Sequence, residues 1–154
     1  MIFTMKIKLT TAFFAFFILF NAVCYAQTKD ETAIKNVLQT QEVAWNNGHV
    51  DDFMKGYWKS DSLMFVGKSG ITYGWQKTLD NYKKNYPDAA AMGKLTFTLL
   101  ELKPLSPKYY FVIGKWNLIR TAGNIGGYFS LLFKRKNYLS KSDLSKFKIN
   151  FYRK

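Results

Sequence analysis

Two side chains of this sequence could carry acid–base chemistry, and both lie at junctions between predicted elements. Asp61 lies in the segment Ser60-Asp61-Ser62, where a helical pattern gives way to a strand pattern. A carboxyl group that faces an aromatic cavity holds its proton more readily and can act as a general base. In the alternative interpretation the segment is a turn, and Asp61 bonds its own backbone. His49, the single histidine, follows Gly48 at the start of a helix, which favours an exposed junction residue over a catalytic one.

Aromatic rings with a polar atom form a second group, which could act by binding. Residues 56–75 read GYWKSDSLMFVGKSGITYGW, with two Trp, two Tyr and four Gly in twenty residues. Tyr and Trp need a hydrogen-bond partner when buried, whereas a core that only fills volume uses Leu, Ile and Val. The cluster favours the wall of a ligand cavity, and plain core packing is the alternative. The expected ligand-binding rings are Trp45, Tyr57, Trp58, Tyr73, Trp75, Tyr82 and Trp116.

One further side chain could fix a charged end of a ligand. Trp116, Leu118 and Arg120 alternate onto one face of a strand, so the guanidinium could lie near the opening and hold a carboxylate. An arginine at the edge in solvent is the alternative. We expect no metal and no cofactor, because one His, one Cys and scattered carboxylates offer no ligand cluster.

Hydrophobic periodicity predicts the helices that must position these residues. A capping box at Thr28 to Glu31, apolar positions at helical spacing and a stop at Gly48 predict a helix over about 29–47. A second helix is expected from residue 50, and a third over about 75–85 before Pro87. The stripe of the second helix comprises Val50, Phe53, Met54, Tyr57 and Trp58.

The remaining patterns predict strands joined by short turns. Two short strands, 62–66 and 71–73, flank a glycine-rich turn. Longer strands are expected over 94–103, 108–121 and 125–135, with a turn between Pro104 and Pro107 after the first of them. Short connections favour antiparallel pairing, and Gly within strands favours bending. The fold class is therefore α+β: a cone-shaped, curved antiparallel sheet wrapped around three N-terminal helices, with a cavity at the open end.

The first 26 residues differ from the rest of the chain. A basic segment precedes the apolar run TTAFFAFFILFNAV, which is followed by Cys24-Tyr25-Ala26. These parts are typical of a secretory signal peptide, so we expect cleavage after Ala26 and a periplasmic or secreted protein without stable membrane insertion. Two weaker alternatives remain. A lipid anchor on Cys24 is disfavoured because Val23 occupies a position where a small residue is usual, and a retained membrane helix because the apolar run is shorter than the roughly 20 residues of a span. The mature chain of about 128 residues suits one domain.

The formal charge of +13 is concentrated toward the C-terminus. From Lys134 onward there are eight Lys or Arg and one Asp, whereas residues 27–133 carry only +4. A solvated basic tail is the plain interpretation, and binding to an anionic polymer or membrane surface is the alternative. We expect no nucleic-acid partner, because no recognised nucleic-acid motif is present.

Short motifs occur in a fixed order through residues 30–134. They are Gln41, Ala44-Trp45-Asn46 and Gly48; Phe53-Met54 and Gly56-Tyr57-Trp58; Ser60-Asp61-Ser62-Leu63; Thr72-Tyr73-Gly74-Trp75; Tyr86-Pro87; Met92-Gly93; and Gly114-Lys115-Trp116 with Leu118 and Arg120. In order and spacing they resemble the nuclear transport factor 2-like superfamily, and within it the SnoaL-like domains of exported bacterial proteins. The resemblance implies a cone-shaped α+β fold, often dimeric, with a hydrophobic pocket. It implies no single activity, since the superfamily includes isomerases, dehydratases, cyclases, epoxide hydrolases and members with no established activity.

Two departures from the family's pattern matter. His49 stands where similar members usually carry Asp, and the last residues read KNYLSKSDLSKFKINFYRK, without the usual Trp and His. We therefore expect a signal peptide at 1–26, the family domain at 27–134 and a basic, divergent or frame-shifted tail at 135–154. Such a tail would pair poorly with the sheet and leave a strand edge exposed.

These observations favour a binding domain over an enzyme, because rings are abundant and catalytic groups are sparse. The expected partner is a small apolar or aromatic molecule, with Arg120 or Asp61 fixing a polar end. One alternative is an isomerase, dehydratase or cyclase with Asp61 as general base and a tyrosine hydroxyl as donor. A second alternative is a dimerisation or adaptor domain, for which a second copy of the chain is a candidate partner.

Overall fold

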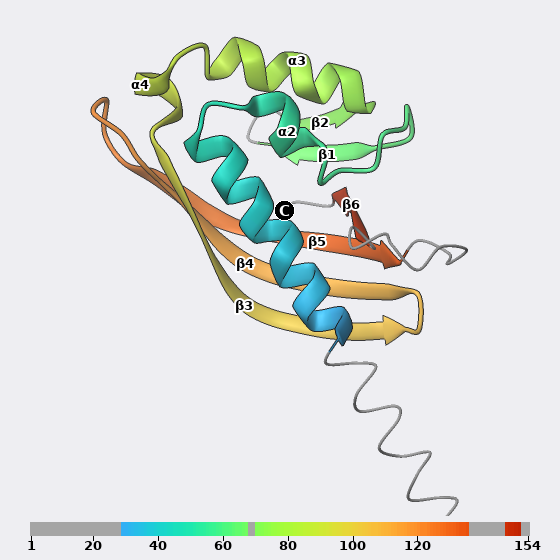
Figure 1. Cartoon of the computed structure of the whole chain (residues 1–154). Helices are drawn as coiled ribbons and strands as arrows, with labels where there is room; N and C mark the ends of the chain where they lie inside the picture. Colours follow the sequence, from blue (N-terminus) through green and yellow to red (C-terminus); the bar gives the residue numbers. More distant parts are fainter. Residues whose placement is uncertain (1–28, 68–69, 136–146, 152–154) are drawn as a thin grey trace, which may run out of the picture. The chain divides into compact units, whose positions relative to one another are not determined.

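A computed structural model describes residues 29–67, 70–135 and 147–151 of the chain (Figure 1). The chain divides into two compact units, Met1–Thr32 and Ala33–Lys154, and the described residues of the first are helical. The predicted signal peptide and its cleavage site lie outside the described residues. Within the described part of the chain, no helix combines the length and the apolar character needed to cross a bilayer.

The helices follow the sequence-based expectation with one addition. The described residues 29–46 are helical, and the helix stops before Gly48, whose φ of +76° is readily adopted by glycine. Helix α3, Trp75–Asn85, has the predicted bounds. Helix α2, Val50–Met54, is shorter than its apolar stripe and ends before Tyr57. A four-residue helix, α4 (Ala89–Met92), was not predicted; the Asp88 carboxylate caps it by accepting a hydrogen bond from the Ala91 N–H at 2.8 Å.

Two antiparallel sheets complete the α+β arrangement (Figure 1). Strands β1 (Met64–Gly67) and β2 (Gly70–Tyr73) form a two-stranded sheet. The larger sheet has the order β3-β4-β5-β6, so each strand pairs with its neighbours in sequence. Its strands are β3 (Lys94–Ser106), β4 (Tyr109–Ile119), β5 (Ile125–Arg135) and β6 (Phe147–Phe151). Figure 1 shows strands β3 to β5 bending together, which confirms the expected curved antiparallel sheet.

The predicted turn between Pro104 and Pro107 begins later than expected, because residues 104–106 belong to β3. Strand β3 continues through Pro104, which pairs with Tyr110, and the chain turns only after Ser106. Proline lacks a donor for the sheet ladder, but β3 is the edge strand, where a missing N–H is tolerated. A register shift between Pro104 and Ser106 accompanies the turn.

The expectation that the C-terminal tail pairs poorly with the sheet is wrong for part of it. Residues Phe147–Phe151 form β6, which pairs antiparallel with Leu131 to Arg135 at the end of β5. The tail as a whole alternates weakly, but the segment FKINF alternates apolar and polar residues as a strand does, and its pairing with β5 covers this edge. Residues 136–146 and 152–154 lie outside the described part of the chain.

One face of the large sheet forms the core of the second unit. Along β4 the buried residues alternate at Tyr110, Val112 and Gly114, which pair with Phe133, Leu131 and Phe129 of β5. Gly114 has a specific steric role, because a Cβ there would lie 2.3 Å from Cζ of Phe129, a ring only 4% exposed. The glycine therefore makes room for a buried ring.

Replacing Gly114 with alanine should destabilise the fold by about 1–3 kcal/mol, because the added methyl group overpacks a ring that cannot move into solvent. Urea unfolding of the variant and the parent measures the loss. Thr98→Ala is the control, since Thr98 is exposed on the same sheet and its loss should cost under about 1 kcal/mol. Equal stability of Gly114→Ala and the parent would contradict the described packing of Phe129.

Side chains of the 33–46 helix hold the outer edge of β3. The Asn46 side chain donates to the Leu95 carbonyl at 3.0 Å and accepts from the Leu95 N–H at 2.7 Å. Two residues further along the strand, a Glu42 carboxylate oxygen accepts the Phe97 N–H at 2.8 Å. These bonds occupy backbone groups that an edge strand would otherwise expose, and they fix the helix beside the sheet.

Replacing Asn46 with alanine should cost about 1–3 kcal/mol of unfolding free energy, because two hydrogen bonds to half-buried backbone groups are lost together. Asn47→Ala provides a matched control. The neighbouring Asn47 is exposed, and no side-chain hydrogen bond joins it to another described residue. Thermal or urea unfolding distinguishes the two, and equal losses would show that the Asn46 bonds contribute nothing specific.

Candidate functional site

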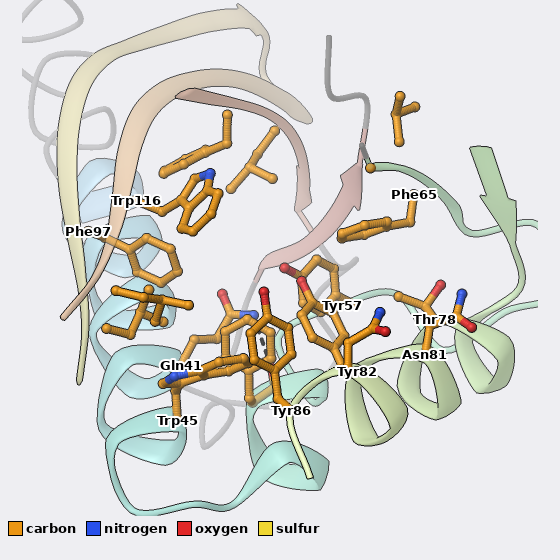
Figure 2. Close-up of a pocket in the computed structure, with 18 of the residues that line it drawn as sticks. Gln41, Trp45, Tyr57, Phe65, Thr78, Asn81, Tyr82, Tyr86, Phe97 and Trp116 are labelled. Atoms are coloured by element: carbon orange, nitrogen blue, oxygen red, sulfur yellow. Dashed lines mark hydrogen bonds between the residues drawn. The ribbon is translucent and has the colours of Figure 1, made fainter. Parts of the chain in front are cut away.

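A cavity of about 670 Å³ lies between the curved sheet and the helices of the second unit (Figure 2). The sheet contributes an apolar wall of alternate residues from β3, β4 and β5: Leu95, Phe97, Trp116, Leu118, Phe129 and Leu131. Pairing in register places Phe97 opposite Trp116 and Leu95 opposite Leu118, so these side chains share one face. Strand alternation thus makes a continuous apolar surface on the sheet side.

The opposite wall is built from helices and carries most of the polar atoms. The 33–46 helix provides Leu38, Gln41 and Trp45, and α2 with the turn after it provides Phe53 and Tyr57. Helix α3 and the residue after it provide Thr78, Asn81, Tyr82, Asn85 and Tyr86. The β1–β2 hairpin adds Phe65, Val66 and Thr72. Figure 2 shows Phe97 and Trp116 on one side of the space, with Tyr57, Tyr82 and Tyr86 on the other.

Trp45 holds the aromatic residues of the helical wall together. Its indole N–H donates to the Met92 carbonyl at 3.2 Å, and its ring meets Phe53, Tyr82 and Tyr86 edge to face, with centroids 4.8 to 5.8 Å apart. Each such ring contact contributes about 0.5–1.5 kcal/mol beyond its buried area. The wall is therefore fixed before any ligand arrives.

Gln41 anchors the same wall through the backbone. It is 2% exposed, and its side-chain amide donates to the Phe53 carbonyl at 2.9 Å. Gly56 leaves the space for that amide, because a Cβ at Gly56 would lie 2.5 Å from the Gln41 side-chain carbonyl carbon. Gln41 interrupts the apolar stripe of its helix, and this interruption was a signal that it lines a cavity. Helical periodicity alone did not predict that role.

The rings expected at the site divide into two groups. Trp45, Tyr57, Tyr82 and Trp116 lie on the cavity wall. Trp58 and Tyr73 do not, and they are 40% and 60% exposed. Helix α2 ends at Met54, so the helical stripe does not carry Trp58 inward. In β2 it is Thr72 that lines the cavity, and strand alternation turns Tyr73 outward.

Trp75 joins two elements and does not line the cavity. Its indole N–H donates to the Met54 carbonyl at 2.9 Å, and the Lys59 ammonium lies 5.1 Å from the centre of its ring. The polar atom that suggested a ligand contact is satisfied by the last residue of α2. Trp75 therefore fixes the start of α3 against the end of α2.

The expectation that Arg120 holds a ligand carboxylate is not met by its position. Strand β4 ends at Ile119, so the alternation does not extend to Arg120. Its guanidinium donates to the Gly123 carbonyl at 3.0 Å and to the Ala91 carbonyl at 3.5 Å. Arg120 thus supports the β4–β5 turn and α4, outside the cavity wall.

The two acid–base candidates also lie away from the cavity wall. Asp61 is exposed in a turn, where the Ser60 hydroxyl accepts the Ser62 N–H at 3.1 Å. The turn interpretation therefore describes the segment, although Ser60 and not Asp61 makes the local bond. The His49 side chain is 65% exposed just before α2, and its Nδ1 lies 3.7 Å from an Asp52 carboxylate oxygen.

A solvent-exposed ion pair lies beside His49. The Lys55 ammonium donates to Asp52, and this hydrogen bond with its ion pair lowers the pKa of that exposed carboxyl. Such a shift belongs to a solvated ion pair at the end of α2. Across the described residues, no group of three or more His, Cys, Asp or Glu side chains could hold a metal ion.

Sequence reasoning missed several wall residues, chiefly Phe65, Asn81, Tyr86, Phe97 and Phe129. A strand register would have found two of them, because Phe97 faces Trp116 and Phe129 faces Gly114 on the same side of the sheet. In the sequence, Tyr86 stood out only as part of the motif Tyr86-Pro87, which gave its ring no role. The direction of its ring depends on packing against Trp45, and this contact cannot be predicted from hydrophobic periodicity.

A bent antiparallel sheet that holds a cavity against N-terminal helices defines the NTF2-like fold, and a solved relative shows the family. An NTF-2-like protein of unknown function from Shewanella oneidensis MR-1 is 36% identical, with 79% of this chain and 94% of that chain covered and a TM-score of 0.70. The chain therefore belongs to the NTF2-like family. The sequence matches no family model and no curated protein.

More distant solved structures share the fold alone. An NTF2-like protein of unknown function from Pseudomonas putida KT2440 is 10% identical, covers 80% of this chain and 83% of its own, and has a TM-score of 0.58. The hexachlorocyclohexane dehydrochlorinase LinA-type3 from Novosphingobium barchaimii LL02 is 15% identical, covers 81% and 84%, and has a TM-score of 0.59. The same fold thus occurs with and without an assigned reaction.

Proposed function

We propose that this domain binds a small, largely apolar or aromatic molecule in the cavity and catalyses no reaction there. One observation carries the proposal: about 670 Å³ of space lies beside rings that stay half-buried, among them Phe65, Tyr82, Phe97 and Trp116. Rings that only filled a core would be fully buried and would leave no such volume. Pockets lined by aromatic side chains with a few polar groups are typical of small-molecule sites.

The energetics of the wall are sufficient for useful affinity. Covering one aromatic ring contributes roughly 1.5–3 kcal/mol through apolar burial. Trp116 and Phe97 from the sheet with Tyr82 and Tyr86 from the helical wall can enclose a planar molecule (Figure 2). After the cost of association, contacts of this size support micromolar binding.

Catalysis receives less support from the same wall. The proposed base of an isomerase, dehydratase or cyclase, Asp61, is exposed and outside the wall. A dehydrochlorinase, the activity named for one distant structural neighbour, must take a proton from carbon and so needs a base. The described wall offers no carboxylate and no imidazole for that step.

Titration of Trp fluorescence with a panel of small apolar compounds tests the proposal. We expect at least one compound to quench or shift the emission with a micromolar dissociation constant, and Asp61→Asn to bind it as tightly as the parent. Absence of any response from a protein shown to be folded would contradict the proposal. A turnover that Asp61→Asn abolishes without loss of fold would establish the catalytic alternative instead.

We also propose that the protein is exported and that its signal peptide is removed. The support is the basic segment and apolar run before Ala26. Expression of the full chain in a bacterial host, followed by N-terminal sequencing of the periplasmic or secreted fraction, tests this. Gln27 as the first residue is expected, and a full-length chain retained in the cytoplasm would contradict it.

A further inference from the structure

No charged residue lies among the described residues of the cavity wall. Its described residues include no Asp, Glu, Lys, Arg or His, although the whole chain has 23 Lys or Arg and 10 Asp or Glu. Moving an ionised group from water into such a site costs several kcal/mol unless an opposite charge or several hydrogen bonds replace its hydration. The described wall residues therefore offer an ionised ligand no opposite charge to replace its hydration.

The polar atoms of the wall are concentrated on one side. The sheet side is apolar apart from the indole of Trp116, whereas α3 and the residue after it provide Thr78, Asn81, Asn85 and Tyr86. A ligand that suits both sides has an apolar body against the sheet and a polar atom toward α3. The polarity of the cavity wall thus increases from the sheet toward α3.

Two of the polar side chains on the helical side are already engaged within the protein. The Thr78 hydroxyl donates to the Gly74 carbonyl at 2.8 Å, and the Asn81 amide donates to the Thr72 hydroxyl at 3.3 Å. Within residues 29–67 and 70–135, no hydrogen bond joins the Tyr86 hydroxyl to another residue. Figure 2 shows this hydroxyl directed into the space that faces Phe97 and Trp116.

The ring of Tyr86 is held in that direction. It meets the Trp45 ring edge to face at a centroid distance of 4.8 Å and stacks with the Tyr82 ring at 6.1 Å. The hydroxyl can rotate to donate or to accept, but the ring that carries it is fixed by its neighbours. A fixed polar atom in a largely apolar site is what gives orientation and specificity to a bound molecule.

We propose that the ligand is an uncharged aromatic molecule with one hydroxyl or carbonyl group, and that Tyr86 determines this preference by hydrogen bonding that group. The inference rests on the proposed function, since it names the class of ligand for the same cavity. The aromatic body lies against Phe97 and Trp116, and the polar group lies beside Tyr86. Tyr86 is thus a specificity-determining residue, a role that the motif Tyr86-Pro87 did not indicate.

Isothermal titration calorimetry with three matched probes tests the inference: naphthalene, 2-naphthol and 2-naphthoate, at neutral pH. We expect 2-naphthol to bind about 3- to 10-fold more tightly than naphthalene, the ratio that one net hydrogen bond supplies. The naphthoate, which is ionised, should bind at least about 10-fold more weakly than naphthalene because its charge is desolvated without a partner.

Tyr86→Phe removes the hydroxyl and keeps the ring. In this variant 2-naphthol should bind no better than naphthalene does, while the affinity for naphthalene stays unchanged. Tyr73→Phe is the control, because Tyr73 is exposed and outside the wall, and both affinities should match the parent's. An unchanged circular dichroism spectrum and unfolding midpoint establish that each variant is folded.

The outcomes separate this inference from the proposed function. If naphthalene binds but 2-naphthol gains nothing, or keeps its gain in Tyr86→Phe, the role of Tyr86 is overturned while the binding function stands. Binding of 2-naphthoate as tight as that of naphthalene would overturn the preference for uncharged ligands. If neither neutral probe binds to the folded protein, both proposals fail together.

Discussion

Replacing Trp45 with alanine should lower the free energy of unfolding by about 3–5 kcal/mol, the range for loss of a buried aromatic side chain. Trp45 is 3% exposed, meets three other rings edge to face and donates to the Met92 carbonyl. No neighbouring side chain can refill the space, because Phe53, Tyr82 and Tyr86 are themselves in contact with one another or with the same ring. Urea denaturation followed by far-UV circular dichroism measures the loss.

Trp58→Ala is the matched control for this measurement. Trp58 is 40% exposed and lies beyond the end of α2, so its removal should cost under about 1 kcal/mol. The two residues share a type and were both predicted as cavity rings, but the fold treats them differently. Similar losses for Trp45→Ala and Trp58→Ala would contradict the described core of the helical wall.

Replacing Trp116 with alanine should weaken binding of a neutral aromatic ligand by about 10- to 100-fold, equivalent to the roughly 1.5–3 kcal/mol that covering one ring contributes. Trp116 lies on the sheet side of the cavity, half-buried and opposite Phe97 in the strand register. Its ring therefore offers one face to whatever occupies the space. Calorimetric titration with 2-naphthol measures the change in affinity.

Trp58→Ala again provides the comparison, and its affinity for 2-naphthol should equal the parent's because Trp58 lies outside the wall. Both variants need a check of fold, since Trp116 also packs against the core cluster. A folded Trp116→Ala protein with undiminished affinity would place the binding site elsewhere. Loss of affinity in Trp58→Ala alone would move it to the outer surface near α2.

Most helices and strands could be predicted from the sequence, because they depend on local residue patterns. The bounds of α3 and β5 follow from helical spacing, strand alternation and the flanking Gly and Pro residues. The curved antiparallel sheet followed from short connections and from Gly within strands. The exceptions have a tertiary cause: β3 extends through Pro104 because it is an edge strand, and α4 is a single turn capped by Asp88.

The sequence predicted only some of the residues that line the cavity. Trp45, Tyr57, Tyr82 and Trp116 lie on the cavity wall, where the polar atoms of Tyr and Trp led us to expect them, and their binding of a ligand stays a prediction. Residue type alone could not say which direction a ring takes once a helix ends early. Trp58 and Tyr73 therefore came out on the surface.

The polar atoms of some side chains have hydrogen-bond partners that cannot be predicted from the sequence pattern. The indole of Trp75 bonds a carbonyl 21 residues away, and the guanidinium of Arg120 bonds the carbonyl of Ala91. Trp75 was assigned to the ligand for the polar atom of its ring and Arg120 for its strand alternation with Trp116, and neither signal shows these partners. Conversely, the role of Gln41 depends on Phe53 and Gly56, which meet it only after the helices pack.

The central claim is that an uncharged aromatic molecule occupies the cavity between the sheet and the helices. Intermolecular nuclear Overhauser effects between isotope-labelled protein and saturating 2-naphthol test it most directly, because they identify the side chains within contact distance of the ligand. We expect contacts to the rings of Phe97, Trp116 and Tyr86. Contacts confined to Trp58 and Tyr73 on the outer surface, or none at saturation, would contradict the claim.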